Sequence, residues 1–342
     1  MTHDTLVFTA KDVLRLLDIR GCIDAVARTL CAHEAGASRG PVSCGLMLRD
    51  GSFHAKAAAV DMEGRTFVAV KANINLPGNL TRRGRPTIQG ALILFDGDTG
   101  QPLAVMDSIA LTSIRTAAVA ALAAEHLSLP SAHTITIVGC GEQGEAQLRA
   151  MCLIRDLRRA FAIDADAAKA GAFARRMSDQ LGLHVEQTAN LAAATSVSEI
   201  CVTCTTSQTP LLYRQNLHPG LFVAAVGADN PAKQEVDATA MAHSRVVVDS
   251  LAACAASGDL HHAIKSKAMT EQDVHGELSA VVAGRIPGRL RDDDVIVFDS
   301  TGTALQDVAA AVLVYERAAV DGVATRVVFD DRPPAGPALG AR

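Results

Sequence analysis

Hydrophobic and polar positions follow two different rhythms along the chain, and the rhythm changes near residue 133. Before that point, one amphipathic helix pattern over residues 10–35 precedes several apolar runs that Gly, Pro and Asn interrupt. The four runs read SCGLMLR, FHAKAAAV, TFVAVKANI and IQGALILFD. Their length and punctuation are typical of strands, so this part predicts an antiparallel sheet.

From residue 133 onward, short apolar strands alternate with helices. The pattern runs through TITIVG, EQGEAQLRAMCLI, RRAFAID, ADAAKAGAFARRMSDQL, ICVTCTT, LFVAAVG and RVVVDS, and ends with VIVFDS before the apolar helix TALQDVAAAVLVYERAA. Such alternation predicts right-handed βαβ units and a parallel sheet that is covered on both faces. A helix of strong helix formers, 111–129, connects the two parts and ends at Pro130. The Pro- and Gly-rich tail 330–342 is expected to be disordered.

Composition narrows the class of protein. A chain of 342 residues is long enough for about two domains, and with 3% aromatic residues its cores must consist of Ala, Val, Leu and Ile. The 32 basic and 37 acidic side chains give a net charge of −5, which argues against a nucleic-acid partner. The sequence has no uninterrupted run of about 18 apolar residues and starts with charged residues, so we expect a cytoplasmic protein without a membrane partner.

Cysteine usage also agrees with a reducing compartment. The eight Cys residues are scattered through apolar segments, which favours free buried thiols over a disulfide framework. Cys201 and Cys204 form one C-x-x-C within a strand-like run, and no second Cys or His pair lies at the spacing of a zinc site. We interpret both as strand residues and expect no metal.

The motif Gly139-Cys140-Gly141-Glu142-Gln143-Gly144 follows a β-branched strand and opens a helix. This is the context of a dinucleotide fingerprint, in which glycines admit the pyrophosphate to the helix N-terminus. Asp164 ends the next strand, where a carboxylate accepts hydrogen bonds from an adenosine ribose and repels a 2′-phosphate. No Arg follows Asp164, so NAD(H) is favoured over NADP(H). The alternative interpretation of the motif is a glycine turn beside a surface Asp, without a bound nucleotide.

Three cations stand in apolar patterns before this motif, namely Lys56, Lys71 and Arg115. Burial of a charge is costly without a partner, so these side chains either reach solvent or converge on an anionic ligand such as a carboxylate. Asp229 follows the strand LFVAAVG, at the sheet edge where ligands of open α/β sheets bind. It is a candidate acid, base or ammonium partner, or alternatively a residue that only caps a turn.

Several blocks together resemble the ornithine cyclodeaminase/μ-crystallin family. They are PTIQGALILFDGDTGQPLAVMDSIALTSIRTAAVAALAA, IVGCGEQG, AAVGADNPAKQEVD and VFDSTGTALQDVAAA, in a match that extends from about residue 10 to 318. The resemblance implies an α/β homodimer in which a Rossmann doubly wound parallel sheet, residues 119–303, is inserted in a second α+β domain. That second domain, residues 1–118 plus 304–342, would bind the substrate and form the dimer.

The resemblance also implies roles for individual residues. Lys71, Arg115 and Asp229 fall on catalytic positions, while Ser300 and Thr301 fall in a loop near substrate and cofactor. Lys71 and Arg115 would hold the substrate carboxylate as well. The positions that fall on cofactor contacts are Thr87, Arg115, Gly139, Gly141, Glu142, Gln143, Gly144, Asp164, Thr205, Val226 and Gly227.

The chain departs from the family pattern in the first strands. Many members carry an Arg of the carboxylate clamp where this chain has Ser43, and Met-Pro-Ala where it has Lys56-Ala57-Ala58. We hypothesise that Lys56 binds substrate in place of the missing guanidinium.

The resemblance favours an NAD-dependent oxidoreductase that transfers hydride at the α-carbon of a small amino or imino acid. An ornithine cyclodeaminase-type ammonia lyase is the alternative, which Asp229 favours and the altered clamp opposes. A non-catalytic ligand-binding protein of the μ-crystallin kind is a third.

Overall fold

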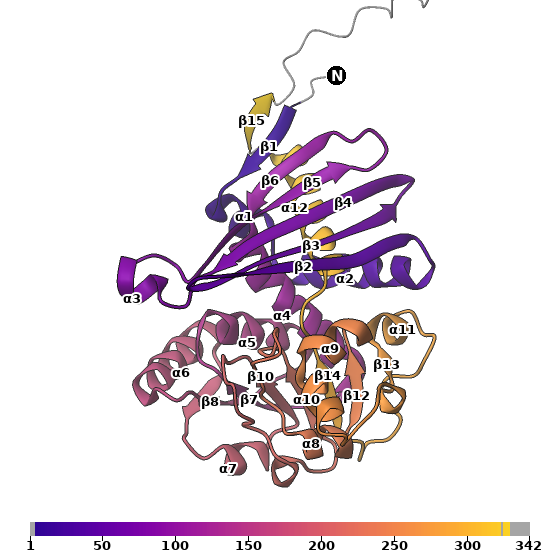
Figure 1. Ribbon diagram of the computed structural model, residues 1–342. Helices are drawn as coiled ribbons and strands as arrows, with labels where there is room; N and C mark the ends of the chain where they lie inside the picture. The colour runs from indigo at the N-terminus through magenta and orange to yellow at the C-terminus, as the bar shows by residue number, and fades with distance from the viewer. Residues whose placement is uncertain (1–3, 323, 329–342) are drawn as a thin grey trace, which may run out of the picture.

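The computed structural model describes residues 4–322 and 324–328, in which two β-sheets lie one above the other (Figure 1). One sheet holds seven strands and the other eight, and helices flank both. The fold is α/β, as the sequence predicts. The C-terminal tail that we expect to be disordered lies outside the described residues.

The seven-stranded sheet is antiparallel over β2 to β6, which confirms the prediction for this part of the chain. The four predicted runs correspond to β2 to β5, and the sequence pattern missed β6, β1 and β15. At one edge β1 pairs parallel to β6 and antiparallel to the short β15. In spatial order the strands are β15 (Thr325–Val328), β1 (Asp4–Phe8), β6 (Pro102–Asp107), β5 (Ile88–Asp96), β4 (Arg65–Asn75), β3 (Gly51–Met62) and β2 (Ser38–Leu48).

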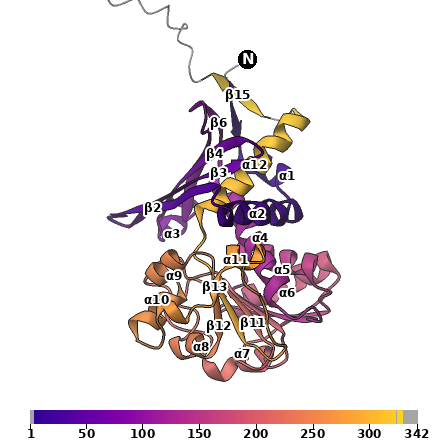
Figure 2. The same cartoon turned by 90° about the vertical axis from the view of Figure 1, so that its right-hand side faces the viewer.

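Helices cover one side of this sheet, where Figure 2 shows α2 (Ile19–Glu34) and α12 (Ala304–Asp321). The prediction of a single helix over 10–35 is wrong, because α1 (Ala10–Leu16) ends before α2 begins. Asp18 causes the break: its carboxylate caps α2 by accepting a hydrogen bond from the Gly21 backbone N–H. A short helix, α3 (Asn79–Arg83), lies between β4 and β5.

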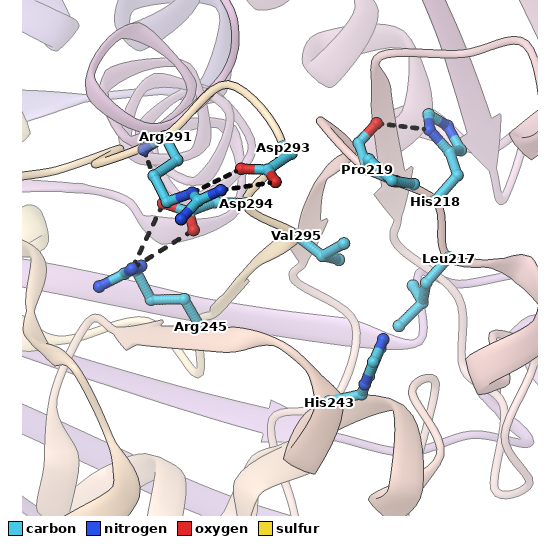
Figure 3. Close-up of a pocket in the computed structure, with 9 residues that line it drawn as sticks. All are labelled: Leu217, His218, Pro219, His243, Arg245, Arg291, Asp293, Asp294 and Val295. Atoms are coloured by element: carbon cyan, nitrogen blue, oxygen red, sulfur yellow. Dashed lines mark hydrogen bonds and ion pairs between the residues drawn. The ribbon is translucent and has the colours of Figure 1, made fainter.

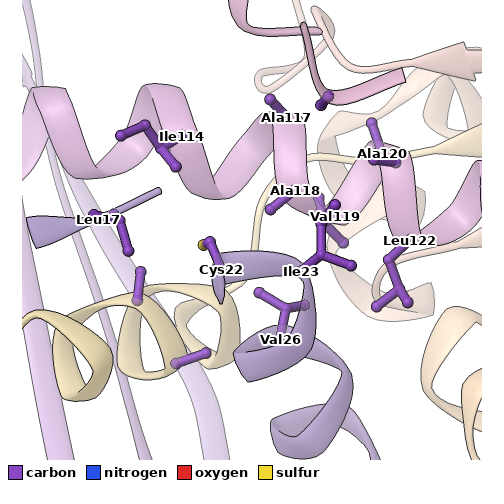
Figure 4. Packing of buried hydrophobic residues seen from close by; sticks show 14 of the residues in the cluster. Leu17, Cys22, Ile23, Val26, Ile114, Ala117, Ala118, Val119, Ala120 and Leu122 are labelled. Atoms are coloured by element: carbon purple, nitrogen blue, oxygen red, sulfur yellow. The ribbon is translucent and has the colours of Figure 1, made fainter. Parts of the chain in front are cut away.

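Helix α4 (Ser108–Leu127) connects the two sheets and begins where Asp107 caps it, three residues before the predicted start. Its small side chains let α2 pack closely against it (Figure 4). Among the described residues α4 alone is long and apolar enough to span a membrane, but 72% of its most apolar stretch is buried inside the protein. It is therefore the core helix of this fold. The packed residues include Leu17, Cys22, Ile23, Val26, Ile114, Ala117, Ala118, Val119, Ala120 and Leu122.

The second sheet is parallel throughout, as predicted. In spatial order its strands are β13 (Gly276–Glu277), β12 (Arg245–Val248), β14 (Ile296–Asp299), β11 (Phe222–Ala225), β10 (Ile200–Thr203), β7 (Thr134–Val138), β8 (Arg159–Ile163) and β9 (His184–Gln187). Its helices are α5 (Glu142–Ile154), α6 (Ala167–Leu181), α7 (Leu191–Thr195), α8 (Ala238–His243), α9 (Leu251–Ser257), α10 (Asp259–Lys265) and α11 (Leu278–Val282), with 3-10 turns at Arg214–Asn216 and Glu271–Asp273.

The strand order locates the ligand edge of this sheet. The chain runs outward from β7 to β8 and β9, and then returns to place β10 on the other side of β7. Ligands of open α/β sheets bind outside the carboxyl ends of the strands at such a reversal. A cofactor site is therefore expected at the carboxyl ends of β7 and β10.

Candidate active site

The glycine-rich turn after β7 has the geometry of a dinucleotide loop. Gly139 has φ +107°, a conformation that L side chains rarely adopt. A Cβ atom on Gly144 would lie 2.1 Å from the Gly139 carbonyl oxygen, so only glycine permits this approach of helix to strand. Gly141 is the N-cap of α5 and offers no side-chain cap. The first N–H groups of α5 are therefore available to a pyrophosphate, and these residues fit a bound dinucleotide.

Asp164 lies directly after β8, beside this loop. Its carboxylate accepts hydrogen bonds from the backbone N–H groups of Cys140 (2.8 Å) and Asp166 (3.1 Å). The Lys169 ammonium on α6 lies 2.9 Å from Asp164 Oδ2. Burial raises the pKa of Asp164, but the Lys169 and backbone hydrogen bonds lower it by more, so the carboxyl stays ionised. The predicted preference for NAD(H) considered only the lack of an Arg after Asp164, whereas the cation beside Asp164 is this Lys.

The loops after β10 and β11 carry Thr205, Val226 and Gly227. Both Thr205 and Gly227 donate backbone hydrogen bonds to one buried carboxylate, that of Glu235. Val226 packs against the core next to them. Glu235 is absent from the predicted site because a Glu in the run KQEVD, between two predicted elements, gives no signal of burial.

The remaining predicted cofactor residues have fewer contacts with the glycine-rich turn after β7. Glu142 is exposed in the first turn of α5, and Gln143 Nε2 donates to the Ser113 carbonyl oxygen of α4 at 3.3 Å. Thr87 precedes β5, and its carbonyl oxygen accepts a hydrogen bond from the Leu76 N–H. The described part of the chain shows no hydrogen bond between Thr87 and the other predicted site residues.

The antiparallel sheet supplies a row of side chains on one face. Ser43 of β2 pairs with Lys56 of β3, and Lys56 pairs with Lys71 of β4. Residues directly opposite in an antiparallel sheet have their side chains on the same face, about 5 Å apart at Cβ. The structure therefore places Lys56 between Lys71 and the position where many family members carry the clamp Arg.

Asp307 of α12 joins Lys71 to Arg115 of α4. Lys71 Nζ lies 2.8 Å from Asp307 Oδ1, and Arg115 Nε lies 3.0 Å from the same oxygen. The side chains are 6%, 5% and 1% exposed for Lys71, Arg115 and Asp307. Asp307 is missing from the predicted site, although a lone acid in the apolar helix run ALQDVAAAV is the same kind of signal that identified Lys71.

The contacts among Lys71, Asp307 and Arg115 determine the protonation states of Lys71 and Asp307. Burial and, second, the nearby Arg115 guanidinium lower the pKa of Lys71 to about 7, although Asp307 opposes them. Burial raises the pKa of Asp307, but Lys71 and Arg115 lower it by more. Lys71 can therefore gain or lose a proton near neutral pH, while Asp307 stays ionised.

The loop after β14 connects the cations to the parallel sheet. Lys56 Nζ donates to the carbonyl oxygens of Thr301 (3.1 Å) and Gly302 (2.6 Å), and burial lowers the pKa of this Lys. Ser300 is buried and donates its hydroxyl hydrogen bond to Asp249 at 2.8 Å. Thr301 Oγ1 is buried without a hydrogen-bond partner in the described chain.

Asp249, at the end of β12, holds this loop in place. Its carboxylate accepts hydrogen bonds from the Gly302 N–H (2.7 Å) and from Gln306 Nε2 (3.3 Å). Gln306 Oε1 in turn accepts from Arg115 Nη1 at 2.7 Å. A continuous set of polar contacts thus runs from Lys56 through the loop and Asp249 to Arg115, across the junction of the two sheets.

Asp229 lies after β11 with a half-exposed side chain, 2.7 Å from the Lys233 ammonium. Burial raises its pKa, but Lys233 and then Lys56 lower it by more. The structure brings Lys56, Lys71, Arg115, Ser300 and Thr301 to one junction, and Asp229 follows β11 at the carboxyl edge of the parallel sheet.

A separate cavity of about 470 Å³ opens at the opposite edge of the parallel sheet (Figure 3). Its charged side chains pair with one another, Arg245 with Asp294 and Arg291 with Asp293, and it lies before β11, β12 and β14 rather than after them. The described residues contain no cluster of three or more His, Cys, Asp or Glu that could hold a metal. Cys201 is a buried free thiol on β10, and Cys204 follows that strand.

Comparisons with known proteins agree with this geometry. A sequence model of the Ornithine cyclodeaminase/mu-crystallin family matches residues 3–322. A Delta(1)-pyrroline-2-carboxylate reductase of Bacillus cereus is 32% identical over 326 residues, which cover 95% of this chain and 100% of that protein.

Two solved structures are also similar. An archaeal alanine dehydrogenase dimer with bound NAD has a TM-score of 0.91 at 31% identity, and the match covers 96% of this chain and 100% of that one. The Delta(1)-pyrroline-2-carboxylate reductase of Thermococcus litoralis, in complex with NADH and L-proline, has a TM-score of 0.90 at 28% identity over 94% of this chain and 100% of that one.

Proposed function

The chain belongs to the ornithine cyclodeaminase/mu-crystallin family, and from that premise we propose that it is an NAD-dependent oxidoreductase of a small α-amino or α-imino acid. One observation carries the proposal: the Lys71–Asp307–Arg115 group lies beside the loop that follows β14, at the carboxyl edge of a dinucleotide-binding sheet. An anion site thus adjoins a cofactor site, and the relatives named above act on amino or imino acids.

The residues divide the chemical work between them. Arg115 and Lys71, with Lys56, hold the substrate carboxylate and so orient the α-carbon. The bound nicotinamide supplies or accepts the hydride. Lys71, with its pKa of about 7, gives a proton to the substrate nitrogen during reduction or removes one during oxidation. Asp229 is a second candidate for this proton transfer, or it binds a substrate ammonium group.

We propose that NADH is preferred over NADPH, because the ionised Asp164 lies where the adenosine ribose binds in such sheets. The rest of the dinucleotide would be held by the glycine-rich loop after β7, by the loop after β10 that carries Thr205, and by the loop after β11 that carries Val226 and Gly227. Lys169 reduces the preference for NADH, because its ammonium partly neutralises the charge of Asp164. Tighter binding of NADPH than of NADH would contradict this assignment.

A cyclodeaminase remains the second candidate, since Asp229 could orient and deprotonate a distal substrate amine. One assay separates the candidates. The purified protein is given NAD with a panel of amino acids, and NADH with pyruvate plus ammonia, glyoxylate plus amines, or Δ1-pyrroline-2-carboxylate. We expect net NADH consumption with at least one imine. Ammonia release without net change in NADH identifies a cyclodeaminase, and nucleotide binding without either identifies a binding protein.

We also propose a homodimer. The apolar side chains Val42, Leu46 and Met47 on the edge strand β2 are 63%, 65% and 86% exposed, and Ile74 and Ile88 on β4 and β5 are exposed as well. Exposed apolar patches and unpaired edges of this kind favour association, and the archaeal neighbour is a dimer. Sedimentation of the wild type against Met47→Asp tests this, with a shift toward monomer expected.

Three further assignments are part of the same proposal. Residues 119–303 form the cofactor domain, and residues 1–118 plus 304–342 form the substrate and dimerisation domain. The protein acts in the cytoplasm on a free metabolite. Its mild negative charge supports the absence of a nucleic-acid partner, and burial of α4 supports the absence of a membrane span.

A further inference from the structure

Glu235 is a fully buried carboxylate that connects two loops of the cofactor edge. Its Oε1 atom accepts hydrogen bonds from the Thr205 backbone N–H (2.6 Å) and the Thr205 hydroxyl (2.7 Å). Its Oε2 atom accepts one from the Gly227 N–H (2.8 Å). The two carboxylate oxygens therefore divide between the loop after β10 and the loop after β11.

The two loops that Glu235 connects lie at the edge of the sheet where a dinucleotide binds. Strand β10 lies beside β7 at the reversal of strand order, and β11 is the next strand in the sheet. Loops at this point border the crevice in which such sheets bind a dinucleotide. A shift of either loop would therefore change the surface on which the cofactor rests.

The local sequence is adapted to this carboxylate. A Cβ atom on Gly227 would lie 2.6 Å from Glu235 Cδ and 2.5 Å from the Thr205 carbonyl oxygen, so only glycine lets the three groups meet. Asp259 fixes the other end, because its Oδ1 accepts hydrogen bonds from the N–H groups of Glu235 (2.8 Å) and Val236 (2.9 Å). Burial raises the pKa of Glu235, and the hydrogen bonds from Thr205 and Gly227 oppose that rise.

We propose that Glu235 is a positioning residue for the cofactor: it holds the Thr205 and Gly227 loops at the separation that bound NAD(H) requires. This rests on the proposed function only in that NAD(H) is the ligand. Glu235 itself is buried beneath the loops and acts through them. Its loss should therefore weaken nucleotide binding more than it weakens recognition of the imine substrate.

The chain offers a matched control at the other edge of the same sheet. Glu199, which precedes β10, accepts hydrogen bonds from the N–H groups of His133 (3.2 Å) and Thr134 (2.8 Å) at the start of β7. Glu235→Gln places an amide N–H where one of the backbone donors needs an acceptor, because Thr205 and Gly227 use different carboxylate oxygens. In Glu199→Gln the amide oxygen can still accept both bonds, because both donors use Oε2. The control therefore makes the same Glu-to-Gln change away from the cofactor edge, and only Glu235→Gln should clearly lower the melting temperature.

The experiment measures the NADH Kd by nucleotide fluorescence, which the absence of Trp in this chain keeps free of tryptophan signal. We expect Glu235→Gln to raise the Kd and the KM for NADH about tenfold, with the KM for the imine within about twofold. Glu199→Gln should leave the NADH Kd within about twofold of wild type. Glu235→Asp, too short to reach both loops, provides a second, milder variant that should raise the Kd in the same direction.

Each outcome bears on a distinct claim. An NADH Kd at the wild-type value in Glu235→Asp, or in folded Glu235→Gln, overturns the positioning role, and so does an equal Kd increase in Glu199→Gln. Failure of the wild type to bind NADH at all overturns the proposed function instead. A higher Kd in a Glu235 variant that retains the imine KM supports the inference.

Discussion

The two halves of the candidate site are built in different ways. On the cofactor side, the parallel sheet presents backbone groups: the free N–H groups of α5, the glycines of its loop, and the loops that Glu235 connects. On the substrate side, Lys71 of β4 and Arg115 of α4 pair with Asp307 of α12, and Lys56 of β3 donates to the loop after β14. The glycine loop of the first half is local in sequence, whereas the second half joins residues as far apart as Lys71 and Asp307.

This difference has an energetic consequence. Backbone donors at a helix N-terminus need no counterion, so the cofactor side can remain solvated before the ligand binds. Lys71 and Arg115 on the substrate side are buried, repel each other and are both paired with Asp307, so loss of Asp307 leaves buried charges unpaired. Variants on the substrate side should therefore have the larger effects.

The largest effect is expected for Lys71→Met, which removes the ammonium but preserves most of the side-chain volume. We expect kcat for imine reduction to fall by about 10²- to 10⁴-fold, the usual contribution of a positioned acid or base. The NADH Kd, measured by fluorescence, should stay within about twofold because the nucleotide loops are separate from Lys71. Loss of NADH binding in this variant would show that the two halves are not independent.

Asp307→Asn should come next. Breaking a buried ion pair by removal of one partner costs about 3–5 kcal/mol, which denaturant unfolding can measure. The substitution also changes the pH profile. In the wild type, kcat/KM for reduction should fall as pH rises through about 7, because the protonated form of Lys71 is the acid.

Asp307 favours the charged form of Lys71, so its removal should move that fall in kcat/KM to lower pH. Oxidation needs the neutral amine of Lys71 as the base, so kcat/KM for oxidation should rise as the pH increases through the same range. A pH profile that is identical in the wild type and Asp307→Asn would exclude Lys71 as the titrating group.

The third prediction concerns the hypothesis that Lys56 replaces the clamp arginine. Lys56→Ala should raise the substrate KM about tenfold, the effect of losing one charged contact to a carboxylate. Ser43 lies directly opposite Lys56, so Ser43→Arg in the Lys56→Ala background should recover most of that loss. An unchanged substrate affinity in Lys56→Ala means that the hypothesis is wrong.

The smallest effect is expected at the exposed end of the cofactor side. Lys169→Met should lower kcat/KM with NADPH a few-fold and leave kcat/KM with NADH nearly unchanged, because Lys169 offsets the charge of Asp164. Asp164→Asn should shift the preference toward NADPH. Steady-state kinetics with both nucleotides measures the ratio, and a ratio unaffected by either change would remove these residues from cofactor selection.

The same contrast explains what the sequence could predict. The glycine loop, Asp164 and the strand–helix alternation follow local rules, so the glycine loop and six of the eight parallel strands were predicted, whereas the short β9 and β13 were missed. In the other sheet β2 to β5 were predicted, whereas β1, β6 and β15 are short, give little periodic signal and were missed. The break between α1 and α2 depends on a single cap at Asp18.

The substrate side was predicted only in part. Lys56, Lys71 and Arg115 were identified as cations in apolar surroundings, and the structure brings them to one junction. Asp307 gave a local signal, an acid in an apolar run, but its partners on β4 and α4 are far away in the sequence. Asp249 was missed because its role depends on the loop after β14. On the cofactor side, Glu235 was missed for the same reason, since its partners lie in the loops after β10 and β11.

Isotope transfer shows whether the cofactor side and the substrate side act together on the α-carbon of the substrate. The protein is incubated with NADH that carries deuterium at the transferring C4 position and with the imine that the activity panel identifies. Mass spectrometry and NMR then locate the label. We predict one deuterium at the α-carbon of the amine product for each NADH oxidised. An unlabelled α-carbon, or label that returns to the nucleotide as ammonia is released, would contradict the account.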